Sequence, residues 1–269
     1  MLQKLRNLKV IMVFIVIAVL CVTLPFFIKR FSKPIYSVDS RIGKLNQEKK
    51  KEQSDKYKTI GWLRVQGTNI DTPIITFYDD DMDEEITVDK ENYLWNEINK
   101  EKLFNKVNIM GHNILNLSSN PASGLENFTR FDDLMSFVYL DFVKDNKYIQ
   151  YTVDGKDYIY KIFAVNFDYQ DRLNLYYDGN YSKSELKKYI NSALKNSIFK
   201  FNVSVDENDK VISLVTCTRM FGYDDQKDFI VNARLVREGE RLSNYNVRET
   251  KNYNKIKSLM KGVESNEKA

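Results

Sequence analysis

Val211-Ile-Ser-Leu-Val-Thr-Cys217 is the stretch from which the fold can be read. Its apolar and β-branched residues predict a buried strand that ends on a cysteine. Val107-Asn-Ile-Met110 is likewise predicted to be a strand, and Gly111, His112 and Asn113 follow it. Further strands are expected over 60–65, from Pro73 onward, and over 148–153, 158–165 and 229–236. Asp154-Gly155, between two of these runs, is a strong hairpin signal.

Helices are expected between the strands. Ser182-Lys-Ser-Glu185 is a capping box that predicts a helix through about residue 197. Its apolar stripe comprises Leu186, Tyr189, Ile190, Ala193 and Leu194. A second helix is expected over 128–142 and a short one over 253–260. Short strands with helical insertions predict a mainly β protein built on a closed or half-closed barrel.

The N-terminus has the layout of a membrane anchor. Residues 10–28 contain no charge and can cross a bilayer core of about 30 Å as a helix. A secretory signal has the same layout, but no small-x-small cleavage site follows the apolar run. Basic residues flank the run equally, so they do not fix its orientation. We expect an uncleaved single-pass anchor in the cell membrane, with the rest of the chain outside the cell.

The net positive charge of the chain comes from the N-terminal segment that contains this anchor. The chain has 41 basic and 37 acidic residues, and six of the basic ones, with no acidic one, lie in residues 1–33. The remaining residues hold 35 basic against 37 acidic side chains. This balance argues against nucleic acid as a partner, because no basic excess is left to neutralise phosphates.

One thiol and one imidazole remain outside the anchor. The chain has one histidine, His112, and two cysteines, of which Cys21 lies in the apolar run and Cys217 does not. A thiolate enzyme needs one of each, at strand ends that a rigid sheet holds beside a cleft. The alternatives are a turn that contains a hydrogen-bonded histidine and a free cysteine that packs as a small hydrophobic residue.

Metal and cofactor chemistry are not indicated, and no cofactor is expected. One histidine and one external cysteine do not make a zinc site. Residues 79–85 are acidic and could bind calcium, but they lack the glycine of a ligand loop, which favours a solvated loop. No glycine-rich phosphate loop is present.

Over about residues 60–238 these motifs, in this order, resemble the sortases, the cysteine transpeptidases of Gram-positive surfaces. The resemblance rests on Gly61-Trp-Leu-Arg-Val65, Ile70-Asp-Thr-Pro73, 108–113, 213–217 and Phe229-Ile-Val-Asn-Ala-Arg-Leu235. The helical insertion before the cysteine strand and the polar segment after the anchor are similar to class B. The Asp-Pro-aromatic lid of class C is absent, because no proline follows an aspartate.

The resemblance implies a closed eight-stranded barrel and a Cys-His-Arg site. Cys217 matches the nucleophile that attacks the threonine carbonyl of a C-terminal sorting motif on a surface protein or pilin. His112 matches the acid and base that serves the leaving amine and then an incoming amine of a cell-wall precursor or a pilin. Thr216 and Asn113 match substrate-binding neighbours.

The arginine of the Cys-His-Arg site has no direct match at the expected position in this chain. In class B it stands at the start of the last long strand, where this chain has Asp228. Antiparallel pairing of 211–217 with 228–236 brings Asp228 beside Cys217 and carries Arg234 roughly 20 Å away. Arg219 is then the better candidate for the cation that stabilises the oxyanion. Arg234 would take this role if the register of the two strands differs. Class B also has serine where this chain has Val215.

The predicted organisation is a cytoplasmic basic N-terminus over 1–9, an anchor over 10–28, a spacer over 29–58, a catalytic barrel over 59–240 and a polar tail over 241–269. The spacer is helical or a flexible stalk. Two functions compete with the transpeptidase. One is a cysteine peptidase that hydrolyses the same motif, and the other is a surface or scaffold protein without catalysis.

Overall fold

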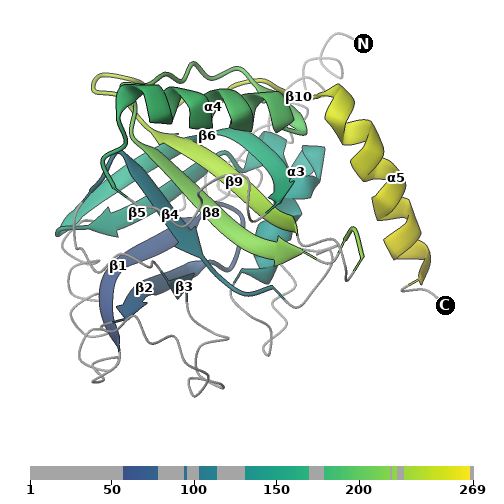
Figure 1. Ribbon diagram of the computed structural model, residues 1–269, viewed down its shortest axis with the longest axis horizontal. Coiled ribbons are helices and arrows are strands. Elements are labelled where there is room, and N and C mark those ends of the chain that lie inside the picture. Colours follow the sequence, from purple (N-terminus) through teal and green to yellow (C-terminus); the bar gives the residue numbers. More distant parts are fainter. Residues whose placement is uncertain are drawn as a thin grey trace, which may run out of the picture. The chain divides into compact units, whose positions relative to one another are not determined.

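A computed structural model describes residues 57–77, 94–95, 103–113, 131–169, 179–218, 220–222 and 227–266. Within these described residues the chain forms ten strands with helices between and after them. Figure 1 shows their arrangement. The elements of the first half are β1 (Tyr57–Val65), β2 (Asp71–Phe77), β3 (Leu94–Trp95), β4 (Lys106–Met110), the 3₁₀ helix η2 (Asp132–Val138) and α3 (Leu140–Asp145). Those of the second half are β5 (Tyr148–Val153), β6 (Lys156–Tyr169), α4 (Lys183–Asn196), β7 (Phe199–Phe201), β8 (Val211–Thr218), β9 (Lys227–Leu235), β10 (Val247–Glu249) and α5 (Lys251–Asn266).

The main sheet has the strand order β1-β2-β3-β4-β8-β9-β6-β5, and β5 pairs with β1. All its pairs are antiparallel except β2–β3 and β4–β8. The β5–β6 hairpin turns at Asp154 and Gly155, whose φ angles of 52° and 67° are those of a type I′ turn. That hairpin prediction is confirmed.

The predicted closed eight-stranded barrel is corrected. Between β2 and β4 the wall of the barrel consists only of the two-residue strand β3. Its residues pair with Ile74 and Ile75 of β2 and with Met110 of β4. The connection from β2 to β4 adds no other strand within the described residues, so the sheet is a half-barrel with one open side. No helix in the described residues is long and apolar enough to span a membrane. Residues 10–28 lie outside them.

The helix α4 covers one face of the sheet (Figure 1). It begins with the predicted capping box, in which the Ser182 hydroxyl accepts from the Glu185 backbone and the Glu185 carboxylate accepts from the Ser182 backbone. Leu186, Tyr189 and Ile190 face the sheet, as expected. Leu194, predicted on the same stripe, is 43% exposed instead. The buried stripe is therefore narrower than the sequence indicated.

A buried polar network fastens α4 to the strands that end at the candidate site. Lys106 is fully buried, and its ammonium donates to the Ser213 hydroxyl at 2.9 Å and lies 4.4 Å from the Tyr189 ring centroid. The Tyr189 hydroxyl donates to Asn232 at 2.6 Å. Burial raises the pKa of the Tyr189 phenol above its usual range. These bonds connect β4, β8, β9 and α4 and so hold the strands in register.

The other helices differ in part from expectation. The helix predicted over 128–142 is the 3₁₀ helix η2 followed by the short α3, separated at Tyr139, which has an extended ψ of 124°. Residues 128–130 lie outside the described part. The helix predicted over 253–260 is longer, because α5 begins at Lys251. Tyr253, Ile256 and Met260 of α5 are buried in the main core. The C-terminal segment thus packs against the domain through β10 and α5.

Candidate active site

Cys217 lies at the exposed end of β8. Every other residue of this strand is buried, and Cys217 is a free, exposed thiol. Successive side chains of a strand alternate between faces, so Cys217 shares the face of Ser213 and Val215 that packs toward α4. The thiol is therefore held by a rigid central strand and is open to solvent.

His112 reaches the same level from the neighbouring strand. β4 and β8 pair in parallel up to Met110 and Val215, and the Gly111 amide donates to the Val215 carbonyl at 3.1 Å. Two more residues in this register place His112 level with Cys217. His112 is exposed. His112, two residues after the end of β4, and Cys217, near the end of β8, thus lie at the same end of two adjacent strands.

Asn113 connects these two strand ends. Its side-chain amide donates to the Cys217 carbonyl at 3.0 Å, and the Cys217 thiol donates to the Asn113 carbonyl at 3.6 Å. The buried Thr216 hydroxyl donates to the Gly111 carbonyl at 2.6 Å. Asn113 and Thr216, predicted as substrate-binding residues, are both buried and fix the backbone of the site. The sequence contained no signal for this clamp, because it depends on the parallel register of β4 and β8.

The predicted register of β8 and β9 is confirmed. Cys217 pairs with Asp228, and Val211 pairs with Arg234. Arg234 is 2% exposed, and its guanidinium donates to both carboxylate oxygens of Glu240, at 2.6 and 2.8 Å. Six residues of strand separate Arg234 from Cys217, which corresponds to about 20 Å. Arg234 is therefore part of a buried ion pair at the opposite end of the strand.

Within the described residues, those in the row opposite Cys217 are acidic. Asp228, 4% exposed, is opposite Cys217, and Asp168 of β6 is the next residue in the row. Lys227 is opposite Thr218, on the other face from Cys217, and its ammonium lies 4.1 Å from the Phe221 ring centroid. Arg219 lies outside the described residues. Within the described part, no cluster of histidine, cysteine, aspartate and glutamate has the form of a metal site.

Comparison with known proteins points to one class. No family profile matches the chain. Sortase B of Listeria monocytogenes serovar 1/2a (strain ATCC BAA-679 / EGD-e) is 26% identical over 224 residues, which are 78% of this chain and 81% of the relative.

Solved structures agree on the fold. A cysteine-to-serine mutant form of Clostridium perfringens sortase B matches with a TM-score of 0.55 and 23% identity, over 77% of this chain and 95% of its own. Sortase B from the type II pilus of Streptococcus pneumoniae matches with a TM-score of 0.51 and 22% identity, over 66% and 91% of the two chains. The fold is thus of the sortase type. The resemblance to class B sortases read from the sequence is confirmed in both sequence and fold.

Proposed function

We propose that this protein is a sortase-type cysteine transpeptidase that cleaves a C-terminal sorting motif and transfers the acyl group to an amine. One observation carries the proposal. The only exposed residue of β8 is Cys217, which is hydrogen-bonded through both its thiol and its carbonyl to the residue that follows His112. The likeness to sortase B supports the same chemistry.

In the proposed reaction the Cys217 sulfur attacks the carbonyl carbon of the motif threonine. The peptide C–N bond breaks, a thioester forms, and the leaving amine takes a proton from His112. An incoming amine then gives a proton to His112 and attacks the thioester. The new amide bond forms, and the Cys217 sulfur leaves as thiolate. The rigid ends of β4 and β8 hold both groups through this cycle.

Substrate and location are also proposals. We infer that the acyl donor is a surface protein or a pilin and that the acceptor is an amine of a cell-wall precursor or a pilin. The pilus origin of one similar sortase B supports a pilin as one candidate. We place the catalytic domain outside the cell, held at the membrane by the apolar run 10–28. An impermeant thiol reagent that fails to label Cys217 on intact cells would contradict this location.

The chain supplies its own control for the nucleophile, because it has two cysteines. A sorting-type peptide incubated with the protein should give a covalent adduct equal in mass to its acyl fragment. The adduct and the cleavage should survive in Cys21→Ala and disappear in Cys217→Ala. Unchanged cleavage by Cys217→Ala would refute the proposed enzyme.

The acceptor step has a separate test. Triglycine or a diaminopimelate-type amine should convert the hydrolysed peptide into a ligated one, measured by mass spectrometry. Continued cleavage without any ligation would instead assign the protein as a cysteine peptidase, in which water resolves the thioester.

A further inference from the structure

The positive charge of the domain is concentrated on one face. Residues 183–200 and 247–251 contain seven basic and two acidic side chains. Outside these segments, residues 34–269 hold 28 basic and 35 acidic side chains. We call the seven cations the basic face: they are exposed and belong to α4, β7, β10 and the start of α5. Its members are Lys183, Lys187, Lys188, Lys195, Lys200, Arg248 and Lys251.

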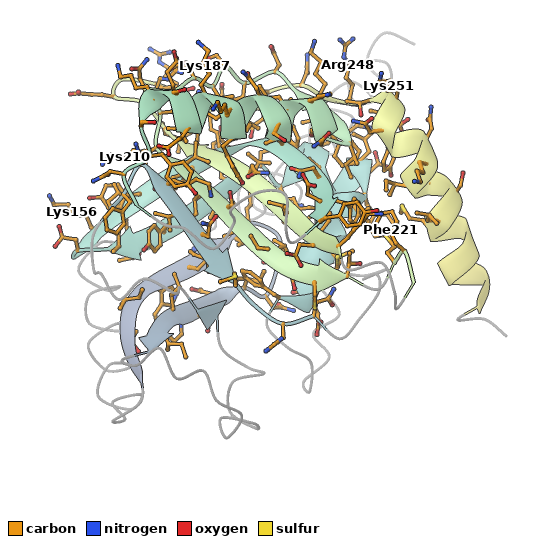
Figure 2. All side chains as sticks on the ribbon, viewed as in Figure 1. Lys156, Lys187, Lys210, Phe221, Arg248 and Lys251 are labelled. Atoms are coloured by element: carbon orange, nitrogen blue, oxygen red, sulfur yellow. The ribbon has the colours of Figure 1, made fainter. Side chains whose placement is uncertain are left out.

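Figure 2 shows Lys187, Arg248 and Lys251 along one edge of the molecule. Hydrogen bonds join the elements that carry them. The Asn252 amide donates to the Lys195 carbonyl at the end of α4 at 3.0 Å, and the Thr250 hydroxyl donates to the Ser197 carbonyl at 2.8 Å. The elements that carry the basic face are therefore held in fixed positions relative to one another.

Carboxylates leave most of this charge uncompensated. Glu185 is used by the capping box of α4, and Glu249 pairs with Lys257 at 2.5 Å. Only Lys187 of the basic face forms an ion pair within the described residues, with Glu207 at 3.2 Å. The face thus presents a positive field toward solvent, which concentrates anions.

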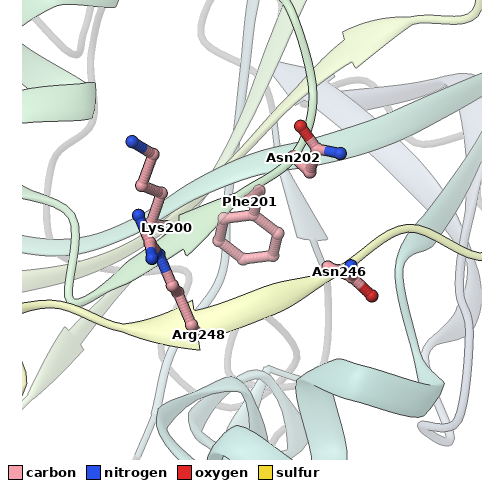
Figure 3. Close-up of a pocket in the computed structure, with 5 residues that line it drawn as sticks. All are labelled: Lys200, Phe201, Asn202, Asn246 and Arg248. Carbon is pink, nitrogen blue, oxygen red and sulfur yellow. The ribbon is translucent and has the colours of Figure 1, made fainter.

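Two of the cations lie directly opposite each other. Arg248 of β10 pairs with Lys200 of β7 in the small antiparallel sheet, and both are exposed. Like charges at such a position disfavour the pairing of the strands, and an anion between them removes that penalty. An open pocket of about 360 Å³ lies here, lined also by Phe201, Asn202 and Asn246 (Figure 3). The exposed asparagines bring amide groups that can bind hydroxyl groups.

We propose that the basic face binds a polyanion of phosphate-linked polyols, with one phosphate between Lys200 and Arg248 and further phosphates along α4. A phosphodiester supplies the anionic oxygens that lysine and arginine bind, and the polyol hydroxyls fit the asparagine amides. This surface is distinct from Cys217, and the proposal does not depend on the transpeptidase activity.

The described residues favour this ligand over two other polyanions, a single-stranded nucleic acid and an anionic bilayer surface. Single-stranded nucleic acid binds by stacking its bases on exposed aromatic rings, but Phe201, the ring in the pocket, is only 6% exposed. A helix that inserts into a bilayer surface needs a free apolar face. The apolar face of α4 is buried against the sheet, and only Leu194 is an exposed large hydrophobic residue of that helix.

The test measures binding of the full-length protein, in neutral detergent, to a poly(glycerol phosphate) chain at several salt concentrations. Binding should weaken as salt increases, and Arg248→Glu and Lys200→Glu should each weaken it about fivefold or more. The matched control is Lys156→Glu in the β5–β6 hairpin, an exposed residue away from the basic face (Figure 2). It makes the same change in net charge and should weaken binding less than twofold. The thermal unfolding midpoint of Arg248→Glu, measured by circular dichroism, should equal that of the unchanged protein, which shows that the fold is intact.

Three results would overturn the proposal. The first is no binding of the polymer, and the second is an equal loss in Lys156→Glu, which would indicate unspecific attraction. The third is binding that depends on Arg248 in the same way but is tighter than binding to the polymer. The two probes for this result are an oligonucleotide of equal charge and vesicles of zwitterionic lipid that also contain anionic lipid. That result would assign the face to nucleic acid or to a bilayer surface.

Discussion

At the scale of single residues, Asn113 determines how Cys217 is held. Its side-chain amide donates a hydrogen bond to the Cys217 carbonyl, which is one of the two hydrogen bonds between these residues. We expect Asn113→Ala to lower kcat about tenfold, because loss of one hydrogen bond, about 1.4 kcal/mol, lets the two strand ends move apart. Steady-state kinetics with a sorting-type peptide measures this effect, and KM should change little.

Asn105 provides the control for that measurement. Its amide donates to the Tyr181 carbonyl at 2.8 Å, before β4 and away from Cys217. Asn105→Ala should lower the free energy of unfolding and leave kcat unchanged. An equal fall of kcat in both variants would mean that Asn113 contributes only to stability.

The arginine question also belongs to this scale. Replacement of the oxyanion-stabilising cation should cost about 100-fold in kcat, so we expect that loss in Arg219→Ala. Arg234→Ala should instead lower stability, because it removes the ion pair between the buried end of β9 and Glu240. Circular dichroism melts beside kinetics separate the two effects. A kcat loss specific to Arg234→Ala would transfer the role to Arg234.

At the scale of elements, the chain after β9 is fixed to the sheet by Glu240. This carboxylate accepts from Arg234 of β9 and from Lys161 of β6, the latter at 2.7 Å. The hydrogen bonds from Arg234, with those from Lys161, hold the pKa of Glu240 far below its ordinary value of 4.5. We expect Glu240→Gln to lower the free energy of unfolding by about 2 kcal/mol.

The same ion pairs predict a dependence on pH. Because the pKa of Glu240 is lower in the folded state, its stabilising effect is complete above the ordinary value of 4.5 and is lost as pH falls below it. Urea unfolding between pH 6 and 3 should therefore show a smaller loss of stability in Glu240→Gln. Glu238→Gln, an exposed neighbour, is the matched control and should follow the unchanged protein.

The elements also show what periodicity can predict. The strands β4, β5, β8 and β9 and the capped helix α4 were predicted because each carries its own local signal. The antiparallel pairing expected for β8 and β9 also predicted that Asp228 lies opposite Cys217. The break at Tyr139 was not predicted, because Phe131, Leu134, Met135 and Val138 fit helical spacing while the backbone there is 3₁₀. The clamp by Asn113 depends on residues 104 positions apart, which no local pattern reports.

At the scale of the whole molecule, α5 completes the core from the C-terminal side. Tyr253 is 5% exposed, and its ring centroid lies 4.8 Å from that of Phe199. We expect Tyr253→Ala to cost about 3 kcal/mol of stability, since a buried aromatic side chain is lost. Tyr253→Phe keeps the ring and should cost less than half as much. Equal unfolding midpoints of Tyr253→Ala and the unchanged protein would show that α5 adds no stability.

The extent of barrel closure is also a property of the whole molecule. Strand patterns in the sequence left a closed and a half-closed barrel open, and the family resemblance favoured the closed form. The side between β2 and β4 remained undetermined, because residues 78–93 are polar and acidic and carry no strand period. The two-residue strand β3 has too little pattern to be recognised in advance.

The position of β8 has a consequence for the order in which the protein is built. β8 lies between β4, about 100 residues earlier, and β9, which ends at Leu235. A parallel pair of this kind forms only after a long connection has closed, so it forms late in folding. During synthesis Cys217 leaves the ribosome before β9, its other neighbour in the sheet, does. The thiol and the imidazole are therefore brought together only when nearly the whole domain has been made.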